Sequence, residues 1–148
     1  MRHRLGMTAL LLVLALPGIS RADLKQALAE SNLEKRSQLA LENARTAYKA
    51  ARAAYDQGDN EQVAAAVHEI EESVNLAYTS LTQTGKDPRR SPKYFKKAEI
   101  ETRELMKHLD AFQQNMSFAD RQMLDSVKAT VQKAHDSLLV GLMEGKHK

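Results

Sequence analysis

The chain has 148 residues and no cysteine, so its histidines and carboxylates are the candidate ligands for a metal ion. A di-metal helical protein needs Glu-x-x-His on two helices, which places both ligands on one face. His68, His108 and His135 each lack a glutamate three residues earlier, so none fits this pattern. His68 precedes Glu72 by one helical turn, a spacing that could hold a metal weakly. We favour the alternative, a solvent-exposed histidine beside an acidic face, and predict no metal site.

Haem binding and nucleophilic catalysis find no pattern in the sequence. Covalent haem needs Cys-x-x-Cys-His, which a chain without cysteine cannot supply. An exported b-type cytochrome uses one Met and one His, but the first predicted helix contains no Met. Neither Gly-x-Ser-x-Gly nor a Gly-rich phosphate loop occurs. We therefore predict no catalytic residue, no cofactor-binding residue and no enzyme, with a haem- or metal-binding helical protein as the alternative.

A basic segment between residues 86 and 97 is the strongest candidate for a binding site. Six cations and one aromatic residue form it: Lys86, Arg89, Arg90, Lys93, Tyr94, Lys96 and Lys97. Asp87 is the one opposing charge in this window. Since three of the lysines open a predicted helix, whose first N–H groups attract anions, we predict an anion- or partner-binding site. The alternative is internal pairing of these cations with Glu99, Glu101 and Glu104 or with the acidic stretch 69–72.

Apolar residues at helical spacing predict four helices that position this segment. The first begins at Asp23 as N-cap and runs toward Gln57, unless Ser31-Asn32 breaks it. The others span about 60–84, 92–115 and 118–140, each preceded by a capping residue. The second carries an apolar seam resembling a coiled coil, and alanines at positions 40, 47 and 54 favour close helix approach. Short loops favour an all-α antiparallel up-down four-helix bundle over 23–143, followed by a disordered tail at 144–148.

The first 22 residues have the three parts of a secretory signal peptide. Arg2 and Arg4 precede an apolar run at 7–16, and Ser20-Arg21-Ala22 follows with small residues at the cleavage positions. The run is too short to favour a spanning helix, so cleavage after Ala22 is preferred over a retained anchor. Removal takes three of 22 basic residues and none of 19 acidic ones, which leaves 19 of each. A neutral mature chain argues against nucleic acid as partner.

Two resemblances suggest a role without an activity. Ala54-Tyr55 followed by Gly58-Asp59 resembles the turn of a tetratricopeptide repeat, a family whose helices present a groove to peptides. The leader, the small size and the helix opening at 91–100 resemble small exported bacterial helical proteins of uncharacterised families, which implies no site residues.

We therefore expect a periplasmic or secreted protein with a structural or protein-binding role in the bacterial envelope. Its expected partner is an unknown protein or an anionic envelope component. The alanine-rich first helix could instead pack against a second copy of the chain.

Overall fold

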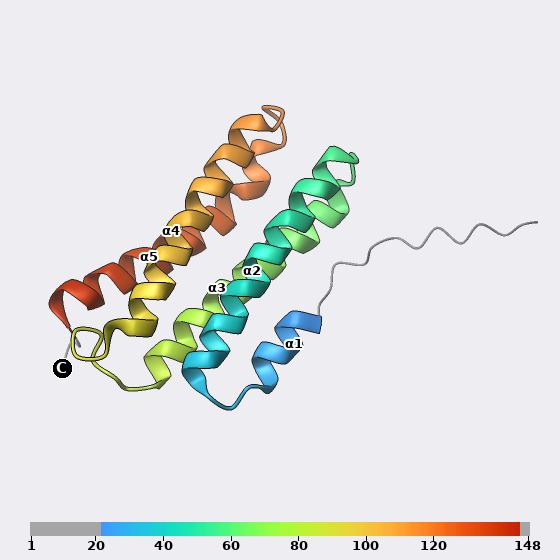
Figure 1. Cartoon of the computed structure of the whole chain (residues 1–148). Coiled ribbons are helices and arrows are strands. Elements are labelled where there is room, and N and C mark those ends of the chain that lie inside the picture. Colours follow the sequence, from blue (N-terminus) through green and yellow to red (C-terminus); the bar gives the residue numbers. More distant parts are fainter. Residues whose placement is uncertain (1–21, 146–148) are drawn as a thin grey trace, which may run out of the picture.

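In a computed structural model the protein consists of five helices packed together (Figure 1). The structure describes residues 22–145, and no strand occurs among them. The prediction of an all-α fold is therefore confirmed. The helices are α1 (Ala22–Ala29), α2 (Leu33–Asp56), α3 (Asn60–Gln83), α4 (Pro92–Asn115) and α5 (Asp125–Glu144), with a 3-10 turn, η1 (Arg121–Leu124), before α5.

The first predicted helix is in fact two helices, because the break at Ser31-Asn32 forms. Asn32 is the N-cap of α2, and its side-chain oxygen accepts a hydrogen bond from the Lys35 N–H at 2.9 Å. An N-cap residue takes an extended backbone conformation, so a helix cannot continue through Asn32 and a new one begins after it. Asp23 lies inside α1, so the expectation that it caps the first helix is wrong.

The junction between α2 and α3 follows the predicted chemistry. Gly58 has a φ of +72°, a left-handed conformation that favours glycine and ends α2. Asp59 then caps α3, and its carboxylate accepts a hydrogen bond from the Gln62 N–H at 3.1 Å. This turn is therefore explained by local sequence alone.

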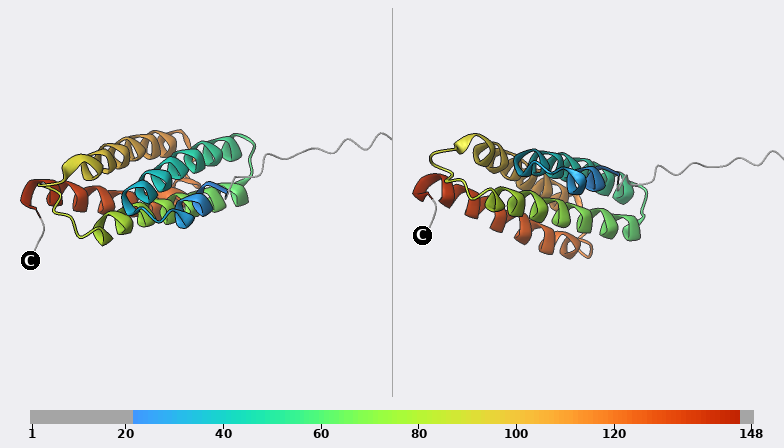
Figure 2. Two further views of the ribbon diagram at one scale, coloured as in Figure 1. Left: turned by 60° about the horizontal axis from the view of Figure 1, so that its bottom comes forward. Right: turned by 90° about the horizontal axis from the view of Figure 1, so that it is seen from below.

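Helices α2 to α5 lie side by side, and consecutive helices run in opposite directions (Figures 1 and 2). Contacts join α2 to α3, α3 to α5, α5 to α4 and α4 to α2. The most extensive contact is between α2 and α3, and α1 packs against α2. The short connections impose this alternation. A short connection can join only helix ends that lie close together, so each helix runs back alongside the one before it.

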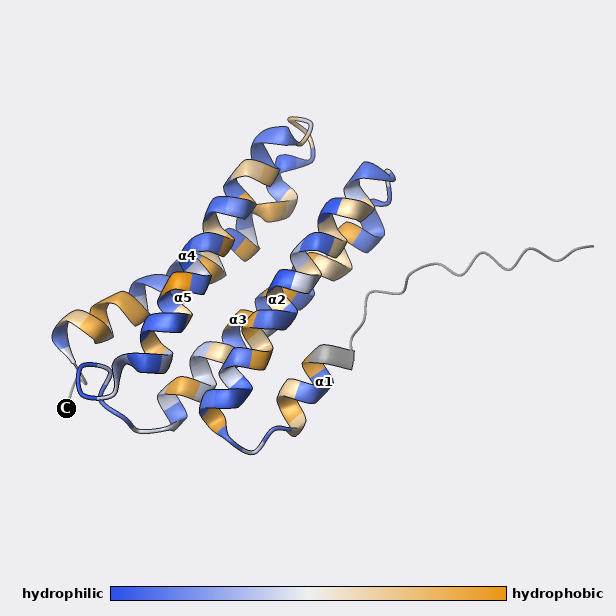
Figure 3. Ribbon diagram, in the orientation of Figure 1, coloured by the Kyte–Doolittle hydropathy of each residue, from blue (hydrophilic) through white to orange (hydrophobic). Residues whose placement is uncertain are grey.

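The contact between α2 and α3 is built on small residues. Every third or fourth residue of α2 is a buried alanine, which lets the two backbones approach closely: Ala40, Ala44, Ala47, Ala51 and Ala54. The facing seam of α3 is also buried, as the apolar periodicity predicts: Val63, Val67, Ile70, Val74, Ala77 and Leu81. Hydrophobic and hydrophilic residues alternate along each helix in Figure 3, as expected for amphipathic helices.

One end of the molecule positions the basic segment. There the connection between α3 and α4, the start of α4 and the end of α5 meet, and we call this the loop end. A smaller apolar cluster fills it, with Leu41, Leu81, Phe95 and Leu138 among its buried members. A larger cluster, which includes Phe112, occupies the rest of the fold.

Both predicted chain-end segments fall mostly outside the described residues. The predicted signal peptide does so except for Ala22, the first residue of α1. Of the predicted tail, Glu144 is instead the last residue of α5 and Gly145 is buried against the loop, whereas 146–148 lie outside the description. No helix within residues 22–145 is long and apolar enough to span a bilayer.

Candidate anion-binding surface

The loop that carries the first basic residues is held in a defined turn by Asp87. The carboxylate of Asp87 accepts a hydrogen bond from the Arg89 N–H at 2.9 Å. Its backbone carbonyl accepts from the N–H groups of Arg90 (3.1 Å) and Ser91 (2.9 Å). Asp87, predicted as the opposing charge of the segment, therefore serves as its turn residue.

Contacts with the end of α5 hold this loop in place. Pro88 is buried, and a β-carbon added at Gly141 would lie 3.2 Å from its Cγ, so glycine permits this close approach. A β-carbon added at Gly145 would lie 3.1 Å from the Cδ of Arg89. The Arg89 side chain thus crosses the C-terminus of α5, where a positive charge is favourable.

The start of α4 presents its cations outward. Pro92 occupies the first turn after Ser91, as predicted, but the Ser91 side chain makes no capping hydrogen bond. No acidic residue lies in the first turn. Phe95 points into the core, whereas Lys93, Lys96 and Lys97 are exposed. The positive end of the helix therefore faces solvent together with three like charges, an arrangement that disfavours the isolated helix and attracts anions.

Ion pairing separates Lys86 from the other cations. The Lys86 Nζ lies 2.6 Å from the Glu34 carboxylate and ties the loop to α2. The remaining five are exposed and form no ion pair within residues 22–145: Arg89, Arg90, Lys93, Lys96 and Lys97. We call these five the basic surface.

The carboxylates expected to neutralise this surface have other partners. Glu99 lies 3.6 Å from Arg103, Glu101 lies 3.4 Å from Arg45, and Glu104 lies 2.9 Å from Lys107. Of the acidic stretch, Glu69 bonds to the buried Asn43 amide, while Glu71 and Glu72 lie near His68. The alternative of internal pairing is therefore not what the fold adopts, because these helices turn their carboxylates toward other neighbours.

Tyr94 is half-buried and packs against the smaller apolar cluster. The Lys93 Nζ lies 5.2 Å from the centre of its ring, within the range of a cation–π contact. Part of the ring face is thus already used by the protein.

A pocket at the loop end was not predicted from the sequence. It has a volume of about 470 Å³ and lies between the end of α3, the loop, Phe95 of α4 and the end of α5. Its walls are mainly apolar: Tyr78, Pro88, Phe95, Leu138, Val140 and Gly141. Because these residues come from four segments of the chain, no local pattern could have indicated it.

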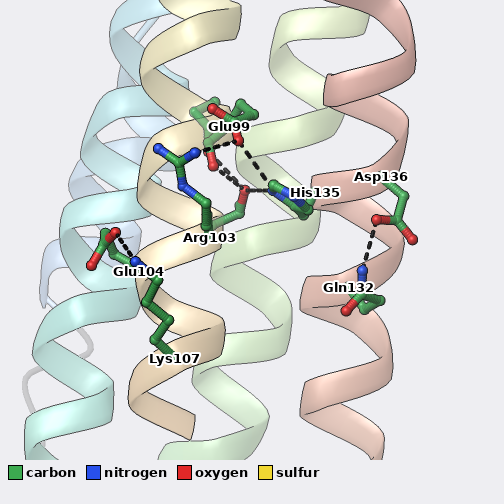
Figure 4. Close-up of polar contacts among 9 residues, drawn as sticks. Glu99, Arg103, Glu104, Lys107, Gln132, His135 and Asp136 are labelled. Carbon is green, nitrogen blue, oxygen red and sulfur yellow. Dashed lines mark hydrogen bonds and ion pairs between the residues drawn. The ribbon is translucent and has the colours of Figure 1, made fainter. Parts of the chain in front are cut away.

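A largely buried polar cluster joins α4 to α5, as Figure 4 shows. His135 Nδ1 lies 3.7 Å from the Glu99 carboxylate and 3.5 Å from the Thr102 hydroxyl. The Thr102 hydroxyl also lies near the Ala98 and Glu99 carbonyl oxygens, at 2.9 and 3.0 Å. Sequence reasoning tested His135 only for metal ligands on its own helix and missed this pair across two helices. The cluster therefore adds a polar contact between α4 and α5.

The other two helical histidines make separate contacts. His68 lies 3.2 Å from Glu72 and 3.9 Å from Glu71, as its spacing predicts, and His108 stacks on Tyr48. Within the described part of the chain, no three histidine, aspartate or glutamate side chains converge in a way that could hold a metal ion.

Two carboxyl groups outside the basic surface have pKa values below their ordinary range. The backbone N–H of Asn32 bonds to Glu30 at 3.0 Å and lowers the pKa of that carboxyl. A hydrogen bond from Lys107 at 2.9 Å, together with the lysine charge, lowers the pKa of Glu104. Both act locally: Glu30 at the turn before α2, Glu104 within α4.

Comparison with known proteins adds no relative, since no protein-family model, curated protein or solved structure matches this chain. Its function must therefore be argued from its own residues.

Proposed function

We propose that this chain is an exported, non-enzymatic binding protein whose helices α2–α5 form an antiparallel up-down four-helix bundle. It docks through the basic surface on an anionic protein or another anionic component of the bacterial envelope. One observation carries the proposal: five exposed cations share one end of the fold without an ion pair among the described residues.

The energetics of this arrangement support an external partner. Positive charge in the first turn of a helix costs roughly 0.3–1 kcal/mol per residue, and Lys93 lies in that turn. Neighbouring like charges add repulsion. An anionic partner would remove both costs on binding, and the uncapped N–H groups of α4 would add hydrogen-bond donors.

The N-terminal sequence supports the proposal that the protein is exported. Residues 1–22 have the pattern of a signal peptide, and their removal leaves equal numbers of acidic and basic residues. Attraction to an anion would then act through the local basic surface rather than through net charge. Such attraction weakens with salt, because added ions screen exposed charges beyond about 8–10 Å.

The test is binding to immobilised poly-glutamate, an acidic polymer without a hydrocarbon chain, at increasing sodium chloride. The test variant combines Arg90→Gln, Lys93→Gln and Lys97→Gln. Each cation near an anionic surface contributes roughly 1 kcal/mol, so removing three should weaken binding by about a hundredfold at low salt. The decrease should shrink as salt rises.

A matched control removes the same charge elsewhere. Lys25, Lys49 and Lys133 are exposed and lie on α1, α2 and α5, outside the basic surface. Replacing these three by Gln should change binding several-fold at most. Equal losses in the two triple variants, or no binding by the unmodified protein, would overturn the proposal. Far-ultraviolet circular dichroism verifies that both variants stay helical.

A further inference from the structure

We propose that the pocket at the loop end binds the alkyl chain of an anionic amphiphile, a long-chain carboxylate or phosphate ester, with its charged head at Arg89. This inference rests on the anion-binding role proposed above and names the chemistry of the ligand. It concerns a site formed by the end of α3, the loop, Phe95 and the end of α5.

The size and lining of the pocket match a hydrocarbon chain. Its volume of about 470 Å³ falls within the roughly 300–1,000 Å³ typical of small-molecule sites. Tyr78, Phe95 and Leu138 form apolar walls, and Val140, 41% exposed, stands at its edge. Burying a methylene group on such walls raises affinity about fourfold, so a chain of several carbons gains affinity without a polar contact.

The polar groups around the pocket already have partners. Thr82 donates to the Thr79 carbonyl at 2.8 Å, and Ser137 donates to the Lys133 carbonyl at 2.8 Å. Asp136 accepts a hydrogen bond from Gln132 at 2.7 Å (Figure 4). Lys86 is paired with Glu34. The two hydroxyl protons are therefore already donated within their own helices. This wall offers few free donors to a sugar, whereas an alkyl chain needs none.

Arg89 does not line the pocket itself, but it is the cation next to the lining residue Pro88, and we assign the charged head to it. It follows Pro88, a wall of the pocket, and its side chain crosses the end of α5 one turn beyond Gly141, another wall. Its guanidinium forms no ion pair within residues 22–145. Arginine binds carboxylate and phosphate oxygens in a bidentate manner, so it suits the head of such an amphiphile. Asp136, an exposed lining residue on α5, disfavours a negative charge on its own side of the pocket.

The probe is dodecanoate, kept below its aggregation concentration and titrated into the purified protein by calorimetry. We expect one dodecanoate per protein, and no measurable heat from acetate, which has the same head without the chain. Dodecyl maltoside, with the same chain on a neutral head, should bind more weakly. Arg89→Gln should lower the affinity for dodecanoate and leave that for dodecyl maltoside unchanged.

Two adjacent tryptophan substitutions test the location. Val140→Trp places an indole ring at the pocket edge and should lower dodecanoate affinity by roughly tenfold or more, since the loss of two methylene contacts, at about fourfold each, already gives about 16-fold. Leu139→Trp is the matched control, because Leu139 is equally exposed (40%) but does not line the pocket. It should leave the affinity within about twofold. Ser137→Leu, from the wall of the pocket, is a second filling variant.

The outcomes separate this inference from the proposed function. No dodecanoate binding by a protein that still binds poly-glutamate would overturn the amphiphile site alone. Equal effects of Val140→Trp and Leu139→Trp would also overturn it. The docking role would be overturned instead if the protein had no affinity for poly-glutamate but bound dodecanoate, with binding weakened by Val140→Trp and kept by Leu139→Trp.

Discussion

Two phenylalanines six residues apart allow a direct test of the packing. Phe112 in α4 is 1% exposed and belongs to the larger apolar cluster, whereas Phe118, beyond the end of α4, is 89% exposed. Replacing each by alanine removes the same atoms. The two substitutions should therefore differ only through the environment that the fold provides.

The magnitude follows from the contacts of the Phe112 ring. Its centre lies 6.2 Å from the Tyr48 ring and 5.7 Å from the Tyr55 ring, both edge to face, and the Arg52 guanidinium lies 5.1 Å away. Phe112→Ala should lower the free energy of unfolding by about 3–5 kcal/mol through lost burial and a residual cavity. Phe112→Leu keeps most of the volume but loses two aromatic pairs of about 0.5–1.5 kcal/mol each, so a loss of about 1–3 kcal/mol is expected.

Urea denaturation, followed by far-ultraviolet circular dichroism, gives these free energies by linear extrapolation. The slope against urea should be the same in all variants, which shows that the change is in stability. Phe118→Ala should stay within about 0.5 kcal/mol of the unmodified protein. A loss below about 1 kcal/mol for Phe112→Ala, or an equal loss for Phe118→Ala, would refute the assignment of α4's buried face.

Three smaller predictions concern polar groups. Asn43→Ala removes the amide that donates to Glu69 at 3.0 Å and to Ser73, so stability should fall by about 2–4 kcal/mol in the same urea titration, and a fall under about 1 kcal/mol would contradict it. Ser80→Ala removes a buried hydroxyl without a hydrogen-bond partner within residues 22–145, so it should be neutral or slightly stabilising, and a marked loss would reveal a bond absent from this fold. Lys107→Ala should raise the pKa of Glu104 toward its ordinary value, measured by carboxyl NMR; in the unmodified protein the pair stabilises the fold above the ordinary carboxyl pKa, and this contribution is lost as pH falls through the lower folded-state value.

Sequence periodicity predicted the helices well where local signals agreed. The seam of α3, its cap at Asp59 and the glycine before it are local features, and each appears as predicted. The start of α2 was open in the sequence because Ser31-Asn32 could sit within a long helix or cap a new one. In the structure Asn32 caps a new helix, because a separate α1 can then pack back against α2 and bury Ala27.

The basic segment shows the limit of such reasoning for the candidate site. The amino-acid sequence predicted both its basic composition and its place at the start of a helix. Whether its cations had internal partners depended on which carboxylates face them across the fold. Glu101 reaches Arg45 on α2, and His135 lies beside Glu99. These pairings join residues 36 to 56 positions apart, which periodicity along one helix cannot predict.

The sequence by itself therefore determined the bounds of α3 and α4, the apolar faces of the helices and a cluster of charge between residues 86 and 97, because these depend on residues within a few turns of one another. Tertiary structure alone decided that five of those cations have no ion pair among the described residues and that a pocket opens beside them. Both depend on how α3, α4 and α5 meet at the loop end, and that meeting is set by packing between distant segments.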